Sequence, residues 1–384
     1  MKFPKKYFSF IYKYNYLLSI YILLTWIGIT GSVINGKINT YLIYTRVFDI
    51  FIKHGNIYDA HPDIFSDYYR YTPTFAILLS PFSLISDYIG PFLWTGLNAF
   101  ILCEGVRKLV KNEKNACIAL WIILVEFETS ILGWQINGLV AGLILLSFAW
   151  ARENKEMKFA LAGICNFFIK IYGGVSLLFT LLYPGERKRF IWIISFFILF
   201  LFLPLLFISF PELCNLYRSE FASIISYKTD LSIMEMFRAW FKIDFPNLPL
   251  QIIASVIFIL PMLLDETYKN ENIKILFLCS SLIFIVLFNQ LAESQTYVIA
   301  VAGFAVYWVL SPKSKINNVL LILVFLFTIL SHTDFYPWNF RENFICPSRI
   351  KAFPMLLAWI KIQYDTWKMI KMGGFRIVKL RYVL

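Results

Sequence analysis

Long apolar segments separated by short polar ones dominate this sequence. The apolar runs lie at about 15–34, 73–87, 91–106, 116–132, 134–150, 159–183, 190–209, 249–265, 273–289, 296–311, 317–332 and 351–367. Because backbone N–H and C=O groups cannot stay unpaired in hydrocarbon, a run that crosses a bilayer must be helical. The pattern predicts an all-α integral membrane protein that is polytopic, with about ten full crossings.

Two of the apolar runs contain helix-breaking residues. The 73–87 run begins at Pro73 and is interrupted by Pro81, and the 159–183 run is broken near Lys170 and the Gly173–Gly174 pair. Such breaks are tolerated at membrane depth where they line a cavity. We expect both segments to be half-crossings or re-entrant hairpins.

Composition agrees with this class. With 59% hydrophobic and 19% aromatic residues, the chain holds more apolar material than a soluble surface could hide, whereas one crossing needs only about 20 apolar residues. The 384 residues leave few long loops, so residues 1–384 are expected to form a single integral membrane domain. The net charge of +12 comes from Lys and Arg scattered between apolar runs, which argues against a nucleic-acid-binding face.

The positions of the basic residues predict an orientation, because short loops rich in Lys and Arg stay cytoplasmic. If both broken segments turn back, most of the basic residues share the side of the N-terminus. This layout predicts a cytoplasmic N-terminus, outer loops at 35–72 and 210–248, a basic cytoplasmic tail at 368–384, and a place in the plasma (inner) membrane. If the 73–87 run were a full crossing, many of these basic residues would move to the opposite side of the membrane, and much of the excess on the N-terminal side would be reversed.

In this layout, polar residues collect at the outer side of the membrane, most densely in residues 55–81, where acids and tyrosines precede an apolar segment. Polar groups at membrane depth are costly and tend to mark functional pathways. The 210–248 loop adds an amphipathic segment expected to lie along the interface as a lid or a plain surface helix. The candidate site residues are Asp63, Asp67, Arg70, Tyr71, Gln135, Asn137, Lys170, Gln290 and Glu293.

Each candidate also has a purely structural interpretation. A single acid in the first loop is ordinary solvated surface, and Gln135 and Asn137 suit hydrogen bonds between helices. Tyr71 fits an interfacial aromatic belt, and Glu293 fits a helix N-terminal acid. Lys170 between apolar half-helices must snorkel, pair with an acid or meet an anion, and we favour an anionic phosphate.

Motifs for other chemistries do not occur in the sequence. The histidines and cysteines form no HExxH, HxH or CxxC pattern, so we expect no metal site and no cofactor. An ordinary nucleotide-sugar enzyme would carry an α/β domain with a Gly-rich or DxD loop, and no such segment is present.

Several short motifs, taken in order, carry a resemblance to a known family. They are Gly55 with Tyr58, Tyr71 with Pro73 and Phe75, Trp94 with Leu97 and Asn98, QINGL at 135–139, FIKIYGG at 168–174 and AESQTYVIA at 292–300. Over roughly residues 39–311 the chain resembles glycosyltransferase family 87, the polyprenyl-phosphate-sugar-dependent mannosyltransferase group of the GT-C superfamily.

The resemblance implies a GT-C-like helical bundle that moves mannose or another hexose from a polyprenyl-phosphate carrier to an acceptor hydroxyl. The acceptor would be a glycolipid or glycan on the extracytoplasmic side. Such a transfer needs a base for the hydroxyl and a cation for the departing phosphate. Family members often carry the base as an Asp-Phe acid about eighteen residues before the position of Tyr58, where this chain has Thr40. We expect Asp67, and next Asp63, to act as the base, and Lys170 to bind the phosphate.

Two other classes of function stay open. Broken helices with an intramembrane lysine also describe a lipid-linked sugar transporter or flippase, and the missing Asp-Phe acid suits a non-catalytic membrane scaffold. A transporter should carry its charges near the midplane, in matching positions of two repeated halves. The sequence shows no convincing repeat, and its charges lie toward one face.

Overall fold

The structure is a computed structural model that describes residues 9–183, 187–226 and 231–374. Across these ranges every regular element is a helix and no strand occurs. The predicted all-α class is therefore confirmed.

The helices of the first half, in chain order, are α1 Tyr14–Ile34, α2 Asn39–Ile52, α3 Pro73–Leu78, α4 Ser80–Ser83, α5 Gly90–Leu109, α6 Glu113–Leu132, α7 Asn137–Arg152, α8 Glu156–Ile169, the 3₁₀ helix η2 Ile171–Leu178, α9 Phe179–Leu182 and α10 Arg187–Phe202. The second half holds α11 Phe210–Ser226, α12 Ile233–Phe241, α13 Asn247–Ile259, α14 Glu266–Lys269, α15 Glu271–Leu287, the short 3₁₀ turn η5 Ser294–Thr296, α16 Tyr297–Leu310, α17 Lys315–Leu323, α18 Trp338–Phe340, α19 Cys346–Ser348 and α20 Ala352–Gly373.

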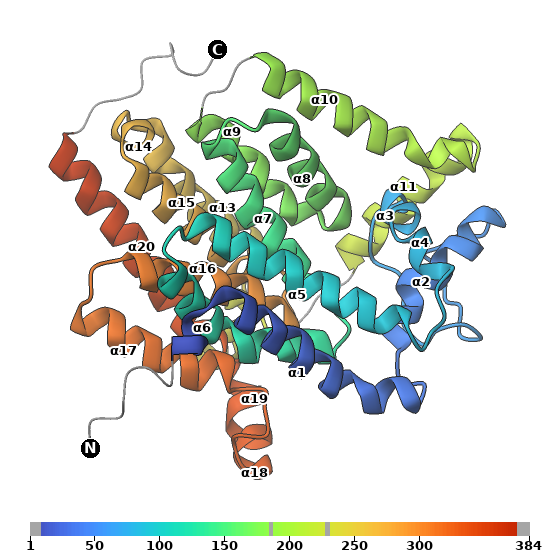
Figure 1. The fold of residues 1–384 in the computed structure, drawn as a ribbon, viewed down its shortest axis with the longest axis horizontal. Coiled ribbons are helices and arrows are strands. Elements are labelled where there is room, and N and C mark those ends of the chain that lie inside the picture. Colours follow the sequence, from blue (N-terminus) through green and yellow to red (C-terminus); the bar gives the residue numbers. More distant parts are fainter. Residues whose placement is uncertain (1–8, 184–186, 227–230, 375–384) are drawn as a thin grey trace.

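The core lies where α5, α6, α7, α15 and α16 meet. Helix α7 packs on α5, and α16 packs on both α6 and α15. Nearly every side chain of α7 and α16 is buried, as expected for helices that are apolar on all sides. Helix α1 crosses the near face of this core, and α10 runs along one edge (Figure 1).

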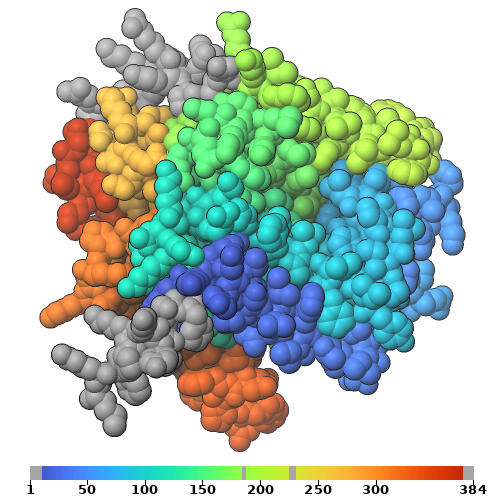
Figure 2. All heavy atoms as spheres, viewed as in Figure 1, coloured from blue at the N-terminus to red at the C-terminus, as the bar shows by residue number. Residues whose placement is uncertain are grey.

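Apolar side chains also cover much of the outer surface. Helices α10 and α13 expose several large ones, including Ile191, Phe197, Ile253 and Val256, and α10 is open on the face shown in Figure 2. Within the part of the chain that the structure describes, three helices are long and apolar enough to cross a bilayer, Tyr14–Ile34, Glu113–Leu132 and Arg187–Leu206. An apolar outer surface and helices of this length are typical of a membrane protein. The number of crossings, predicted to be about ten, and the orientation in the membrane stay predictions.

Both predicted helix breaks are present. The 73–87 run forms two short helices, α3 and α4, which meet at Leu79. Helix α8 ends at Ile169, Lys170 has extended backbone angles, and the Gly173–Gly174 pair lies in η2. Gly173 lies against the backbone carbonyl of Asn166, where an added Cβ would come within 2.6 Å of the oxygen. Re-entry of these segments into the membrane stays a prediction.

Glycine allows the closest helix contact in the core, between α5 and α7. A Cβ at position 142 would lie 2.4 Å from the carbonyl oxygen of Ile101, so a larger residue must push the two helices apart. We expect Gly142→Ala to lower the free energy of unfolding by about 1–3 kcal/mol, measured by denaturant titration in detergent micelles.

A matched control is Gly31→Ala in α1, because a Cβ at position 31 meets no heavy atom within 4 Å. Alanine favours the helix over glycine, so this variant is expected to keep or gain about 0.5–1 kcal/mol. Equal losses from both substitutions would contradict the packing explanation.

Candidate active site

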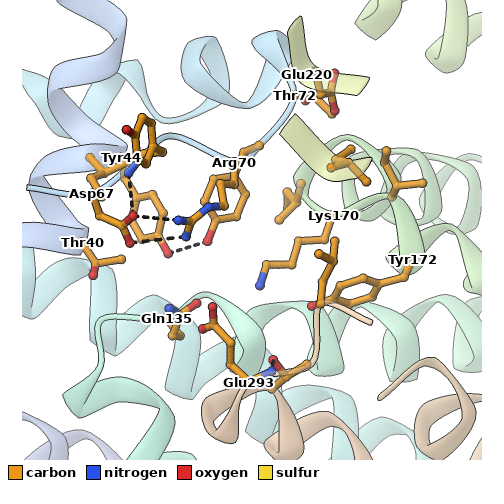
Figure 3. Close-up of a pocket in the computed structure, with 18 of the residues that line it drawn as sticks. Thr40, Tyr44, Asp67, Arg70, Thr72, Gln135, Lys170, Tyr172, Glu220 and Glu293 are labelled. Atoms are coloured by element: carbon orange, nitrogen blue, oxygen red, sulfur yellow. Dashed lines mark hydrogen bonds and ion pairs between the residues drawn. The ribbon is translucent and has the colours of Figure 1, made fainter. Parts of the chain in front are cut away.

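A cavity of about 350 Å³ opens between the predicted first outer loop, the end of α8, α11 and the turn before α16 (Figure 3). Its lining combines charged, amide and aromatic side chains with a few aliphatic ones. The lining residues are Thr40, Ile43, Tyr44, Asp67, Tyr68, Arg70, Tyr71, Thr72, Gln135, Ile169, Lys170, Ile171, Tyr172, Glu220, Ile224, Asn289, Leu291, Glu293 and Thr296.

Helix α2 forms one wall of the cavity. The predicted outer loop 35–72 thus contains a 14-residue helix, and its Thr40, Ile43 and Tyr44 line the cavity. The Tyr44 and Tyr71 hydroxyls are 2.8 Å apart and hydrogen-bonded. Thr40, the residue at the position of the family's acid, lies on the same side of the cavity as Asp67 in Figure 3.

The motif around Pro73 fixes this loop against α8. Thr72 is the N-cap of α3: its hydroxyl accepts the Phe75 N–H at 3.2 Å, and Pro73 occupies the first turn, where its missing N–H costs nothing. The Thr72 hydroxyl also donates to the carbonyl of Phe168. Tyr71 and Lys170 are brought to one place by this contact.

Lys170 extends from the end of α8 into the cavity, between Arg70 and Glu293 in the view of Figure 3. Its Nζ donates to Asn137 Oδ1 at 2.9 Å. The same ammonium lies 5.6 Å from the ring centroid of Tyr71 and 5.7 Å from that of Tyr172, within the range of cation–π attraction. Among the described residues no carboxylate forms an ion pair with Lys170, so its remaining N–H groups can bind a ligand in the cavity.

Asn137 connects Lys170 to the turn before α16. It begins α7 and is 1% exposed; its Nδ2 donates to the carbonyl of Gln295 at 3.0 Å while its Oδ1 accepts from Lys170. Asn98 of α5 supports this end of α7, because its Oδ1 accepts the Leu139 N–H at 3.1 Å. Four of the sequence motifs are therefore linked by these hydrogen bonds.

Asp67 and Arg70 form an ion pair at the rim of the cavity. Arg70 donates to Asp67 Oδ1 at 2.8 Å and to Oδ2 at 3.3 Å, and the Tyr68 N–H donates to Oδ1 at 2.7 Å. Both oxygens of this carboxylate thus accept hydrogen bonds within the loop. Side-chain exposures of 27% for Arg70 and 49% for Asp67 keep the pair accessible from solvent.

Glu293 is a helix N-terminal acid, as one interpretation of the sequence suggested, while its role in binding substrate stays a prediction. It is the N-cap of η5, where its side chain accepts from the Thr296 N–H and its own N–H donates to Thr296 Oγ1 at 3.1 Å. Its carboxylate also lines the cavity.

The structure brings most predicted site residues together. Asp67, Arg70, Tyr71, Gln135, Lys170 and Glu293 line the cavity, and Asn137 contacts Lys170 directly behind it. Gln290 lines an adjoining cavity. Asp63 is exposed and does not line the main cavity.

Two acidic or amide side chains of the lining, Glu220 and Asn289, are not among the predicted site residues. Glu220 of α11 is 7% exposed. Asn289 uses its Oδ1 to accept the Leu291 N–H at 2.9 Å, while its buried Nδ2 has no acceptor among the described residues. A buried amide without an acceptor is costly, so a ligand or water in the cavity is its natural partner.

The cavity continues toward the apolar outer surface. Tyr172, Ile224, Asn289 and Leu291 line both the main cavity and the adjoining one of about 350 Å³. Gln251 of α13 lines the adjoining cavity and also an open apolar groove of about 430 Å³ along α13. The main cavity, the adjoining cavity and the apolar groove along α13 are therefore neighbours in the fold.

Among the residues that the structure describes, no group of three or more His, Cys, Asp or Glu side chains could hold a metal ion. The polar groups gathered at the cavity are those that bind phosphate and sugar hydroxyls: a lysine, an arginine, carboxylates, amides and tyrosines.

Comparison with known families matches the sequence model of glycosyltransferase family 87 to residues 69–333. The match includes the α3 motif, Lys170 and Glu293, and begins after Asp67. A comparison with curated proteins finds no match. The matched region covers most of the chain, and the protein therefore belongs to glycosyltransferase family 87.

Proposed function

We propose that this glycosyltransferase moves a hexose, with mannose the first candidate, from a polyprenyl-phosphate carrier to an acceptor hydroxyl at the extracytoplasmic side of the plasma (inner) membrane. The observation that carries the proposal is the position of Lys170. Its ammonium is hydrogen-bonded to Asn137 inside a polar cavity, and an adjoining cavity shares lining residues both with this cavity and with an apolar groove along α13. A lipid phosphate needs both a cation and an apolar path.

In this proposal Lys170 contacts the phosphate as it leaves, and Arg70 provides a second cation at the rim. A preorganised cation is effective here because negative charge develops on the leaving oxygen in the transition state. Tyr71 and Gln135 contact the sugar, Gln290 lies along the path of the prenyl chain, and the acceptor is a glycolipid or glycan. The base is a carboxylate, for which Asp67 and Asp63 are the candidates that the sequence predicts.

The test is transfer by purified protein in nanodiscs from radiolabelled polyprenyl-phosphate mannose and polyprenyl-phosphate glucose to a panel of glycolipid acceptors. We expect transfer with one donor. Absence of transfer combined with donor-dependent flux across liposomes would favour the transporter, and absence of transfer, flux and donor binding would favour the scaffold.

The orientation is tested separately by cysteine substitution at positions 63 and 290. Both positions lie on the predicted outer side, so each cysteine is expected to react with a membrane-impermeant maleimide added to intact cells. A cysteine at position 111, in the predicted cytoplasmic turn between α5 and α6, is the control and should react only after lysis. The opposite pattern would reverse the proposed sidedness.

A further inference from the structure

The three carboxylates that line the cavity differ in what they bind. Asp67 accepts two hydrogen bonds from Arg70 and one from a backbone N–H. Glu293 accepts from the Thr296 N–H as the cap of η5. Both of these carboxylates therefore already accept hydrogen bonds from the protein itself.

Glu220 has no such donor among the described residues. Tyr58, Tyr69 and Tyr217 are close enough to feel the charge of Glu220. Their hydroxyls donate to the backbone carbonyls of Tyr71, Thr72 and Leu201, at 2.9, 2.7 and 3.0 Å. The tyrosine hydroxyls are therefore committed to backbone carbonyls, while Glu220 is 7% exposed and lines the cavity.

The geometry points to Glu220 as the base that takes the proton of the acceptor hydroxyl, with Asp67 serving to position Arg70. This inference rests on the proposed function. In it, α11 supplies the base that the resemblance would place at position 40, where this chain has a threonine. Both Glu220 and Lys170 line the same cavity, so the groups that the transfer needs share one chamber.

The acceptor hydroxyl gives its proton to a Glu220 carboxylate oxygen while the acceptor oxygen bonds to the anomeric carbon of the donor sugar. The bond from that carbon to the phosphate oxygen breaks, and its electron pair stays on the polyprenyl phosphate, beside Lys170. Glu220 then releases the proton to water.

Charge state supports this role. Helix α11 lies in the predicted outer loop, and burial raises the pKa of Glu220 to about 7, close to the value that suits a base working at neutral pH. Burial raises the pKa of Tyr58, Tyr69 and Tyr217 above the ordinary value, so these neighbours stay neutral. The other charged groups of the cavity are Asp67, Arg70, Lys170 and Glu293.

The first test is kinetic and compares Glu220→Gln with Asp67→Asn in the transfer assay. We expect Glu220→Gln to lower kcat by about 10²–10⁴-fold without weakening the binding of polyprenyl phosphate. For the wild type, kcat/KM should rise tenfold per pH unit at acidic pH and level off above about pH 7. Asp67→Asn should raise KM and keep that pH midpoint, and Glu220→Asp should keep the pH limb at a lower rate.

The second test does not depend on transfer. A hydrophobic carbodiimide reacts with protonated carboxyl groups, so mass spectrometry should find Glu220 labelled at pH 6 and protected at pH 8. Absence of pH-dependent labelling, or full activity of Glu220→Gln, would overturn the inference. Normal labelling in a wild-type protein that transfers no sugar and binds no polyprenyl phosphate would instead refute the proposed function.

Discussion

Lys170→Ala is expected to lower kcat/KM for sugar transfer by about 10²–10³-fold, the usual effect of removing one preorganised group that stabilises transition-state charge. The loss follows from the position of the ammonium, which is hydrogen-bonded to Asn137 and placed between the rings of Tyr71 and Tyr172. The measurement is steady-state transfer of radiolabelled sugar in nanodiscs, with binding of polyprenyl phosphate followed in parallel.

Two variants sharpen this test. Lys170→Arg keeps the charge, but its planar guanidinium presents its donors in a different geometry, so we expect partial activity. Lys111→Ala removes an exposed lysine of the turn between α5 and α6 and should leave transfer unchanged. Wild-type activity in Lys170→Ala would show that this lysine does not contact the phosphate.

Local signals in the sequence predicted the framework of the site. The break at Lys170 was predictable because a cation and a Gly-Gly pair interrupt an apolar run, and the start of α3 because Thr72 and Pro73 form an N-cap and first turn. Each of these signals involves only residues that are close together in the sequence. Residues 71, 137, 170 and 293 lie in or beside such local signals, so the sequence alone could propose them as site residues.

Glu220 was missed because the 210–248 loop was treated as one amphipathic surface. The signal was present: Leu213, Leu216 and Tyr217 precede Glu220 at helical spacing, which places the acid on the apolar face of α11. Leu213 and Leu216 are indeed buried with it. An acid on the buried face of an amphipathic helix needs an explanation, and the cavity provides one.

A long-range ion pair could not be predicted in this way. Lys351 precedes α20, and Glu126 lies in α6, 225 positions away. Both side chains are 0% exposed, with Nζ 2.8 Å from Oε1, and Lys351 also donates to Ser294 Oγ at 3.1 Å, next to Glu293. Each residue stands near the end of an apolar run, where a charge usually reaches water. Only the packing of α6 against the α16 region and α20 reveals the pair.

Lys351→Met is expected to lower the free energy of unfolding by about 3–5 kcal/mol, because it leaves the Glu126 carboxylate buried without its cation. The other oxygen of that carboxylate, Oε2, already has no hydrogen-bond partner among the described residues. Denaturant titration in detergent micelles measures the change. A surface control is Lys155→Met, which breaks a pair with Glu153 whose side chains are 45% and 32% exposed and should cost less than about 1 kcal/mol.

The double variant Lys351→Met with Glu126→Leu separates lost charge pairing from lost packing. Replacing both partners of a buried pair by apolar residues removes the uncompensated charge, so the double variant should recover most of the stability lost by Lys351→Met. The Ser294 hydroxyl would still lack its lysine donor, and hydrogen exchange of the turn that contains Glu293 should remain faster than in the wild type. A double variant as unstable as Lys351→Met would show that packing of the lysine side chain, rather than neutralisation of Glu126, is what stabilises this part of the fold.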